Sequence, residues 1–150
     1  MPVSPPSRSN VTPLPGSRRK VLIVEDDAAI ALAAFNRLQS RRFEVCGIAA
    51  TLDEALRMAA EHWPDIVVMD IRLKEGNGIE AAHLIRSNYA SAILFATAFC
   101  DEHRDRLPED TWCLQKPYDM NELQDALEAL CLNREGLPIP IALPPSLVRL

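Results

Sequence analysis

Residues Asp65–Leu73 read DIVVMDIRL, and this stretch predicts how the rest of the chain is organised. Ile66 to Met69 form a short apolar run rich in β-branched residues, which is typical of a strand covered on both faces. The run stops at a carboxylate, Asp70. In an open parallel α/β sheet the ligand crevice lies outside the carboxyl ends of the strands, so the position of Asp70 predicts contact with a ligand.

Other apolar runs also end in polar groups. Residues 21–24 precede Glu25 and Asp26, a later run ends near Thr97, and another ends at Lys116. Because the carboxyl ends of parallel strands meet at one edge of a sheet, we expect these side chains to converge on one pocket with Asp70.

Segments with helical spacing alternate with the apolar runs, which predicts an α/β fold with a mostly parallel sheet and right-handed crossovers. Asp27, Thr51 and Asn77 are expected to cap helices, and Thr51 lies three residues before Glu54, as in a capping box. The expected strands are 20–24, 43–49, 66–69, 92–96 and 111–115, and the expected helices are 28–38, 51–63, 79–86 and 121–132, with a short charged helix at 101–107.

The chain of 150 residues is long enough for one buried core and too short for two ordinary domains. Residues 1–19, rich in proline and poor in large apolar side chains, are expected to form a flexible leader before a domain at 20–133. Residues 134–150 carry four prolines among apolar side chains. This tail is therefore either disordered or extended against a groove on this or a neighbouring molecule.

The composition excludes several classes of protein. A formal net charge of −5, without a long Lys/Arg run, disfavours nucleic-acid binding. No apolar run approaches the roughly 20 residues that span a bilayer, and the first residues lack a secretory signal, so a cytoplasmic location without membrane contact is expected. Four cysteines, Cys46, Cys100, Cys113 and Cys131, have no CxxC spacing, which predicts reduced structural thiols.

In order and spacing, the strand-end motifs resemble those of the receiver domains of two-component response regulators over about residues 20–132. The motifs are VEDD at 24–27, MD at 69–70, ATA at 96–98 and KP at 116–117. The resemblance implies a flavodoxin-like fold in which a five-stranded parallel sheet, with strand order 2-1-3-4-5, carries helices on both faces.

The resemblance implies that Asp70 accepts a phosphoryl group. It also implies that Glu25, Asp26, Asp70 and the main-chain carbonyl of Arg72 hold Mg²⁺. Elementary electrostatics agrees with this assignment, because crowded carboxylates repel one another and a divalent cation with oxygen ligands lowers their energy.

The same resemblance implies that Thr97, Ala98 and Lys116 bind the phosphate and that a shift of Thr97 repacks the loop behind it. The rotating aromatic of many receivers is replaced here by Cys113, three residues before the lysine. The stretch FATAF is similar to the FAT loop of single-domain receivers that lack this aromatic. We therefore hypothesise that its last residue, Phe99, is the moving ring.

The expected function is that of a stand-alone response regulator, phosphorylated by a histidine kinase or a phosphotransfer protein. The docking face for the phosphodonor is expected to include Ile30, Ala31, Pro117 and Tyr118, because these residues flank the acid pocket. The output is expected to be binding to an unidentified protein. Homodimerisation through the fourth helix, fifth strand and last helix is an open alternative.

Two other hypotheses for the function are open besides the response-regulator hypothesis. The replacement of the aromatic by Cys113 is compatible with a scaffold that binds its partner whether phosphorylated or not. A Mg²⁺-dependent aspartyl phosphatase is disfavoured, because such enzymes need an acid two residues after the nucleophile, where this chain has Arg72. We thus expect no enzymatic activity beyond self-phosphorylation and slow self-dephosphorylation.

Overall fold

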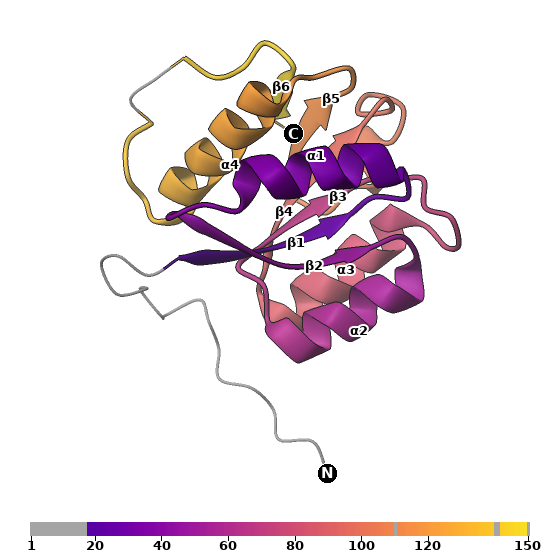
Figure 1. The fold of residues 1–150 in the computed structure, drawn as a ribbon. Coiled ribbons are helices and arrows are strands. Elements are labelled where there is room, and N and C mark those ends of the chain that lie inside the picture. The colour runs from indigo at the N-terminus through magenta and orange to yellow at the C-terminus, as the bar shows by residue number, and fades with distance from the viewer. Residues whose placement is uncertain (1–17, 110, 140–141, 150) are drawn as a thin grey trace.

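A twisted sheet with strand order β2-β1-β3-β4-β5-β6 forms the centre of the molecule (Figure 1). The computed structural model describes residues 18–109, 111–139 and 142–149. The first five strands run parallel, as the sequence predicted, and a sixth short strand pairs antiparallel with β5. The strands are β1 (Arg19–Val24), β2 (Phe43–Ala49), β3 (Ile66–Met69), β4 (Ala92–Thr97), β5 (Trp112–Gln115) and β6 (Leu147–Arg149).

Helices cover both faces of this sheet (Figure 1). α1 and α4 pack on one face, and α2 and α3 pack on the other. Their bounds are α1 (Ala28–Leu38), α2 (Leu52–His62), α3 (Gly78–Tyr89) and α4 (Met120–Arg134). Among the described residues, no helix combines the length and the apolar character needed to cross a membrane.

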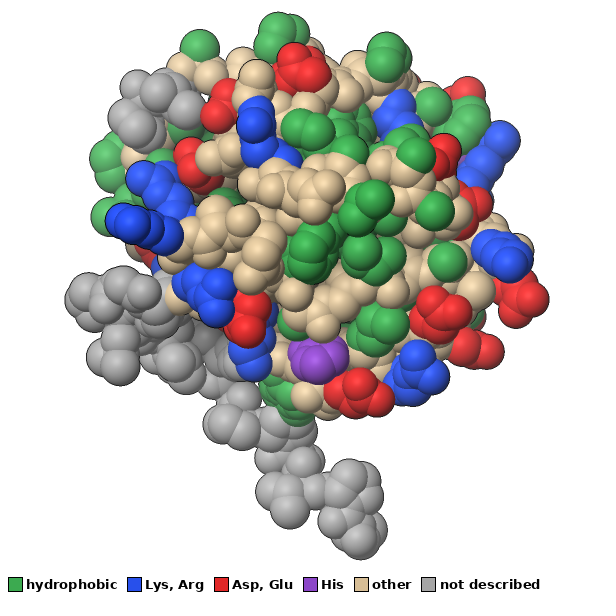
Figure 2. Space-filling view, viewed as in Figure 1, with side chains coloured by type: hydrophobic (Ala, Val, Ile, Leu, Met, Phe, Trp, Pro, Cys, Tyr) green, Lys and Arg blue, Asp and Glu red, His purple; other side chains and the backbone are tan. Residues whose placement is uncertain are grey.

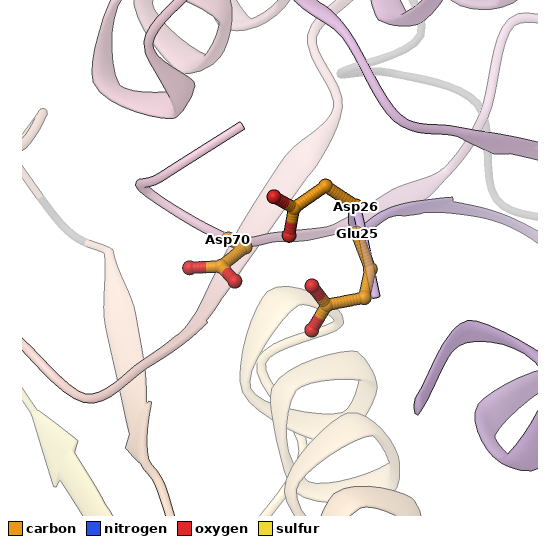
Figure 3. Close-up of side chains that lie close together, drawn as sticks. All are labelled: Glu25, Asp26 and Asp70. Carbon is orange, nitrogen blue, oxygen red and sulfur yellow. The ribbon is translucent and has the colours of Figure 1, made fainter. Parts of the chain in front are cut away.

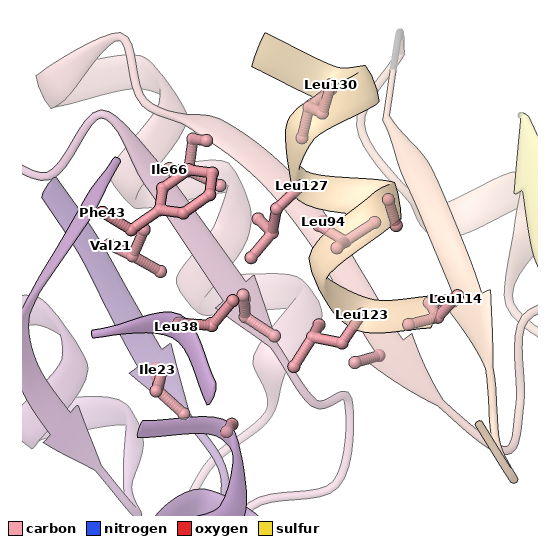
Figure 4. Packing of buried hydrophobic residues seen from close by; sticks show 14 of the residues in the cluster. Val21, Ile23, Leu38, Phe43, Ile66, Leu94, Leu114, Leu123, Leu127 and Leu130 are labelled. Atoms are coloured by element: carbon pink, nitrogen blue, oxygen red, sulfur yellow. The ribbon is translucent and has the colours of Figure 1, made fainter. Parts of the chain in front are cut away.

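Alternate residues of each central strand serve two separate cores, which explains why the strand sequences are apolar throughout. In β1, Ile23 points to the face covered by α1 and α4, whereas Leu22 points to the face covered by α2 and α3. Leu123 and Leu127 of α4 point toward Leu38 of α1, and all three are inaccessible to solvent (Figure 4).

The predicted helix caps are present. Asp27 accepts hydrogen bonds from two backbone N–H groups of the first turn of α1, and Asn77 accepts one from Ile79 at 2.7 Å. Thr51 accepts the N–H of Glu54, but the Glu54 carboxylate accepts from Ala50 rather than from Thr51. Each helix therefore begins where a side-chain oxygen satisfies its free N–H groups.

The connection between β4 and β5 departs from the sequence prediction. The expected helix at 101–107 is wrong, because only a single 3₁₀ turn, η2 (Arg104–Arg106), forms there. Pro108 follows at once and the segment offers few apolar side chains at helical spacing, so a longer helix has little to bury. A short loop thus takes the place of a fifth helix.

The same connection is closed by a disulfide between Cys100 and Cys113, whose Cα atoms lie 5.9 Å apart. The prediction of reduced thiols is therefore wrong for this pair, because the fold brings together two cysteines 13 residues apart that show no spacing motif. Cys46 and Cys131 are free thiols, as predicted.

The carboxyl-terminal tail packs against α4 and β5 in its described part (Figure 1). Ile139, Leu143 and Leu147 are half-buried against the core beneath α4. The N–H of Gln115 in β5 donates to the Ser146 carbonyl at 2.8 Å, and Leu147 to Arg149 continue the pairing as β6. Of the two alternatives for this tail, the extended one applies to the described residues.

Arg19, expected in the leader, begins β1 and pairs with Phe43. Residues 1–17 of the expected leader lie outside the described part of the chain. On the face shown in Figure 2, acidic and basic side chains are interspersed around a central area of hydrophobic ones.

Candidate functional site

Three carboxylates meet at the carboxyl edge of the sheet (Figure 3). Glu25 and Asp26 follow β1, and Asp70 follows β3. One oxygen from each lies within 4.8 Å of the others. Glu25 and Asp70 are buried, with 6% and 8% of their surfaces exposed, whereas Asp26 is exposed. The acids that the sequence assigned to separate strand ends are thus neighbours in space.

Backbone hydrogen bonds fix this convergence. The N–H of Asp70 donates to the Val24 carbonyl at 2.9 Å, and the N–H of Glu25 donates to the Ala49 carbonyl at 2.9 Å. These bonds continue the pairing of β3 with β1 and of β1 with β2 by one residue. The two carboxylates are therefore held by the central ladder of the sheet rather than by a mobile loop.

Lys116 supplies a cation to the same site. Its Nζ donates to Glu25 Oε1 at 2.7 Å and to Asp70 Oδ2 at 3.0 Å. Its backbone N–H donates to the Thr97 carbonyl at 2.8 Å, and the peptide bond to Pro117 is cis. Lys116 therefore links the ends of β1, β3, β4 and β5.

Burial and hydrogen bonds within the site shift the pKa values of Glu25 and Lys116. Burial raises the pKa of Glu25 to about 7, although hydrogen bonds from Lys116 and from the Asp27 N–H act in the opposite direction. Burial by itself would lower the pKa of Lys116, but its hydrogen bonds to the two carboxylates outweigh this effect and raise that pKa. Lys116 is therefore charged, and Glu25 titrates near neutrality.

The donor set suits a hard divalent cation. Three carboxylates converge, while Lys116 offers the site one positive charge. Magnesium prefers one or two carboxylates with waters and other oxygens, and the exposed Asp26 leaves one side of the cluster open to solvent. The residues present thus fit Mg²⁺. The observed contact of Arg72 with the cluster is its N–H, 3.4 Å from Asp70 Oδ1.

Thr97 ends β4 beside the acids, and its side chain is fully buried. None of the described residues hydrogen-bonds to its Oγ1, which is costly for a buried hydroxyl and calls for an explanation such as a functional role. The next residue, Ala98, is exposed, and its carbonyl accepts a hydrogen bond from the Gln115 side chain at 2.9 Å. The loop after β4 is thus tied to the residue before Lys116.

Phe99 lies on the same loop and is half-buried. The Arg72 guanidinium lies 3.8 Å from the centre of its ring, and His103 contacts the ring edge-on with centroids 6.3 Å apart. Trp112 and Cys113, which are neighbours along β5, belong to opposite cores. Phe99 is therefore an aromatic side chain directly connected to the loop that follows Asp70.

The expected docking residues differ in exposure. Pro117 is exposed, Ile30 and Tyr118 are half-buried, and Ala31 is buried in the core, beneath any docking face. Burial raises the pKa of Tyr118 to about 12, so its hydroxyl stays protonated. Ile30 and Tyr118 also line a small cavity together with Glu25 and Asp70.

Gly78 is a site residue that the sequence did not single out. A Cβ at this position would lie 1.9 Å from the Asp70 carbonyl oxygen and 2.9 Å from the Ile71 Cα. Its N–H donates to the Ile71 carbonyl at 2.8 Å. Gly76, two residues earlier, has φ +88°, a backbone angle that glycine adopts without strain, but no spacing motif marks the close approach of Gly78.

Comparison with known proteins agrees with this architecture. The family model described as response regulator receiver domain matches residues 21–128. The transcriptional regulatory protein PdtaR of Mycobacterium tuberculosis is 34% identical over 113 residues, which cover 73% of this chain and 55% of PdtaR. The photosynthetic apparatus regulatory protein RegA of Rhodobacter capsulatus is 30% identical over 133 residues, which cover 83% of this chain and 68% of RegA.

A solved structure extends the comparison. The response regulator PhyR from Brucella abortus superposes with a TM-score of 0.70 at 31% identity, covering 81% of this chain and 50% of PhyR. This chain therefore spans about half the length of PdtaR and of PhyR. The strand-end carboxylates, the lysine that bridges them and the matching profile lead to one conclusion: the chain belongs to the receiver domain family of response regulators.

Proposed function

We propose that this chain is a phosphoryl-accepting switch and that Asp70 is the acceptor. The observation that carries the proposal is the double contact of Lys116, whose Nζ lies within hydrogen-bonding distance of both Asp70 and Glu25. A buried carboxylate held beside an ammonium group is a nucleophile with a fixed position and a charge partner for an incoming phosphoryl group.

The transfer step uses one oxygen of Asp70. This oxygen attacks the phosphorus of a phosphohistidine or a small acyl phosphate, and the bond from phosphorus to the donor breaks. The product is an aspartyl phosphate, and the donor leaves as imidazole or carboxylate. The ammonium of Lys116, already 3.0 Å from Asp70, pairs with the negative oxygens of the transferring group.

Glu25, Asp26, Asp70 and the main-chain carbonyl of Arg72 would hold Mg²⁺. When bound, this ion neutralises charge on the acids and on the phosphoryl oxygens. The carboxylate cluster supports this assignment, because its oxygens lie within 4.8 Å of one another.

Thr97 and Ala98 would receive the phosphoryl group. The unpartnered Oγ1 of Thr97 gains a hydrogen-bond acceptor when a phosphoryl oxygen arrives, and the N–H of Ala98 is the adjacent backbone donor. A small shift of Thr97 toward the phosphate would pull on the following loop. Phe99 lies on that loop, and its contact with Arg72 gives the ring a definite resting position. We propose that this ring moves when Asp70 is phosphorylated.

The donor would be a histidine kinase or a phosphotransfer protein. Ile30, Pro117 and Tyr118 flank the acids and are at least partly accessible, so they form the proposed docking face. The output would be binding to another protein, in a cytoplasmic setting. Relatives of this chain include a transcriptional regulatory protein, PdtaR, and an anti-anti-sigma factor, PhyR of Bartonella quintana, so proteins that control transcription are the first partners to test.

A second candidate is a scaffold whose binding is independent of phosphate. Cys113 favours it, because this residue occupies the position of the usual rotating aromatic and is locked in a disulfide. The two candidates differ in one measurable quantity. The affinity for a protein partner changes with phosphate, or with its mimic beryllofluoride, only for the switch.

The test is phosphorylation with radiolabelled acetyl phosphate. The native chain with Mg²⁺ should incorporate label, and Asp70→Asn or excess EDTA should abolish incorporation. Asp65→Asn is a matched control, because Asp65 lies at the opposite end of the same strand. Equal labelling of the native and Asp70→Asn proteins would refute the proposal.

A further inference from the structure

A disulfide joins the loop after Thr97 to the strand that leads to Lys116. Cys100 lies three residues after Thr97, and Cys113 lies three residues before Lys116. Both cysteines are fully buried, and Cys100 Sγ lies 3.9 Å from the Thr97 carbonyl. The covalent link therefore starts beside Thr97 and ends on the strand that leads to Lys116.

The segment that this link closes has little structure of its own. Among its described residues, regular structure is limited to η2. Leu107 is buried in the core on the α2 and α3 side, and further attachments are side-chain contacts: His83 Nε2 lies 3.0 Å from the Arg106 carbonyl, and the Arg86 guanidinium donates to the Glu109 carbonyl. A segment with so few internal hydrogen bonds opens locally more easily than the sheet beside it.

We propose that Cys100 and Cys113 form a reversible thiol–disulfide site that dithiols reduce. The redox state of this site determines how far residues 98–111 move with Thr97 when Asp70 is phosphorylated. The regulatory part of this inference rests on the proposed function. In the oxidised protein, the sulfur link holds the start of the loop to β5. In the reduced protein, two separate thiols let the loop move with Thr97.

A dithiol supplies the electrons and protons that reduce the disulfide. One thiolate of the dithiol attacks a protein sulfur, the protein S–S bond breaks and a mixed disulfide forms. The second thiol of the dithiol then attacks this mixed disulfide. Two electrons and two protons pass to Cys100 and Cys113, and the dithiol leaves as a cyclic disulfide. Because both protein sulfurs are buried, attack requires local opening of the loop.

The other cysteines do not compete in this exchange. Cys131 belongs to α4 and Cys46 to β2, away from the loop. Burial raises the pKa of Cys131 to about 11 and also raises that of Cys46, so both remain thiols with little nucleophilic thiolate. In a reducing compartment, a disulfide that forms is most often transient and regulatory.

The first measurement is a thiol count on denatured protein. Protein purified without reductant should show two thiols, those of the free Cys46 and Cys131, and dithiothreitol treatment should raise the count to four. The Cys46→Ser/Cys131→Ser variant is the matched control and should show none and then two. Four thiols before reduction would overturn the inference.

The second measurement is hydrogen exchange of residues 98–111 with and without beryllofluoride and Mg²⁺. In reduced protein the mimic should change the exchange rate of this segment at least several-fold, and in oxidised protein it should change the rate much less. Cys100→Ser/Cys113→Ser should behave as reduced without dithiothreitol. If that variant fails to fold, dithiothreitol-treated native protein gives the same comparison. Equal responses in the two redox states would contradict the inference.

The same samples separate this inference from the proposed function. Each redox form is also treated with acetyl phosphate and Mg²⁺, and the label on Asp70 is measured. If neither form gains label, the proposed function and the regulatory role fall together, while the thiol count still decides whether the disulfide exists. If both forms gain label and their loops respond equally, only the redox inference falls.

Discussion

The Nζ of Lys116 lies 3.0 Å from an oxygen of Asp70, although 46 residues separate them in the chain. Lys116 also contacts Glu25, which burial would otherwise favour in its neutral form. The ammonium group therefore occupies the place where the proposed metal ion and phosphoryl group would both act. Much of the chemistry of the site follows from this single contact.

Replacement of Lys116 by methionine should separate metal binding from phosphoryl transfer. Removal of the ammonium group takes away a competing positive charge, worth roughly 1 to 4 kcal/mol at about 4 Å. Mg²⁺ affinity should rise about tenfold or more, while phosphorylation of Asp70 slows on the order of a hundredfold. Calorimetric titration and label incorporation measure the two effects.

Lys20→Met is the control for this experiment. Lys20 lies at the amino end of β1, and its Nζ contacts the His62 carbonyl at 3.4 Å, far from the acids along the strand. This variant should leave both quantities unchanged. An unchanged Mg²⁺ affinity in Lys116→Met would show that the ammonium group does not compete with the ion.

Mg²⁺ binding should strengthen as the pH rises to about 7, because the pKa of Glu25 is raised to about 7 in the metal-free protein. Below this pH, the ion must displace a proton from Glu25, which costs up to about tenfold in affinity for each pH unit. Titration calorimetry in buffers of different ionisation enthalpy should detect the released proton. Glu25→Gln should bind more weakly and lose the pH dependence.

The same shift affects the stability of the metal-free protein. The folded state binds more protons than the unfolded state between the ordinary carboxyl pKa of 4.5 and about 7. The contribution of Glu25 is therefore fully present below 4.5 and is lost as the pH rises to about 7. Denaturant titrations across this range should show the decline in native protein and its absence in Glu25→Gln. A decline of equal size in both proteins would assign it to other groups.

Gly78→Ala should displace Asp70 through a steric clash with the Asp70 main chain. The added methyl group would lie 1.9 Å from the Asp70 carbonyl oxygen, so the loop after β3 must move. Overpacking of this kind costs roughly 1–3 kcal/mol of unfolding free energy, and the displaced Asp70 should accept phosphate more slowly. Ser87→Ala, on the exposed part of α3, is the control. Native-like phosphorylation of Gly78→Ala would show that the loop adapts without moving Asp70.

The packed tail should contribute measurably to stability. Leu147 is half-buried against the core beneath α4, whereas Leu137 remains 50% exposed. Leu147→Ala should lower the unfolding free energy by about 1–2 kcal/mol, since only part of a full core contribution is lost. Leu137→Ala should change it by no more than about 0.5 kcal/mol. Equal effects in urea denaturation would mean that the tail does not hold to α4 in solution.

The sequence was sufficient for the parallel sheet and for the gathering of acids at its edge. The reason is physical: buried parallel strands need continuous apolar runs, and their carboxyl ends share one edge. Asp70, Glu25 and Lys116 each follow such a run, so their meeting could be predicted from strand order. The helix caps Asp27 and Asn77 could also be predicted from the sequence, since a cap depends on residues that are neighbours in the chain.

Features that depend on distant packing could not be read in this way. The disulfide requires Cys100, in the loop after β4, to approach Cys113 in β5, and no local motif marks that approach. Likewise, the apolar, proline-rich tail has the composition of either a disordered or a docked segment. Its composition does not reveal that β5 offers an edge with which the tail pairs as β6. The close contact of Gly78 with Asp70 depends on how α3 meets β3.

The central claim is that one carboxylate, Asp70, receives the phosphoryl group. The most direct measurement is to phosphorylate the chain with acetyl phosphate and Mg²⁺, reduce it with borohydride and map the modified residue by peptide mass spectrometry. An aspartyl phosphate is reduced to homoserine, so conversion at position 70 and at no other acid is the predicted result. Conversion at Glu25, Asp26 or a surface acid, with Asp70 intact, would contradict the account.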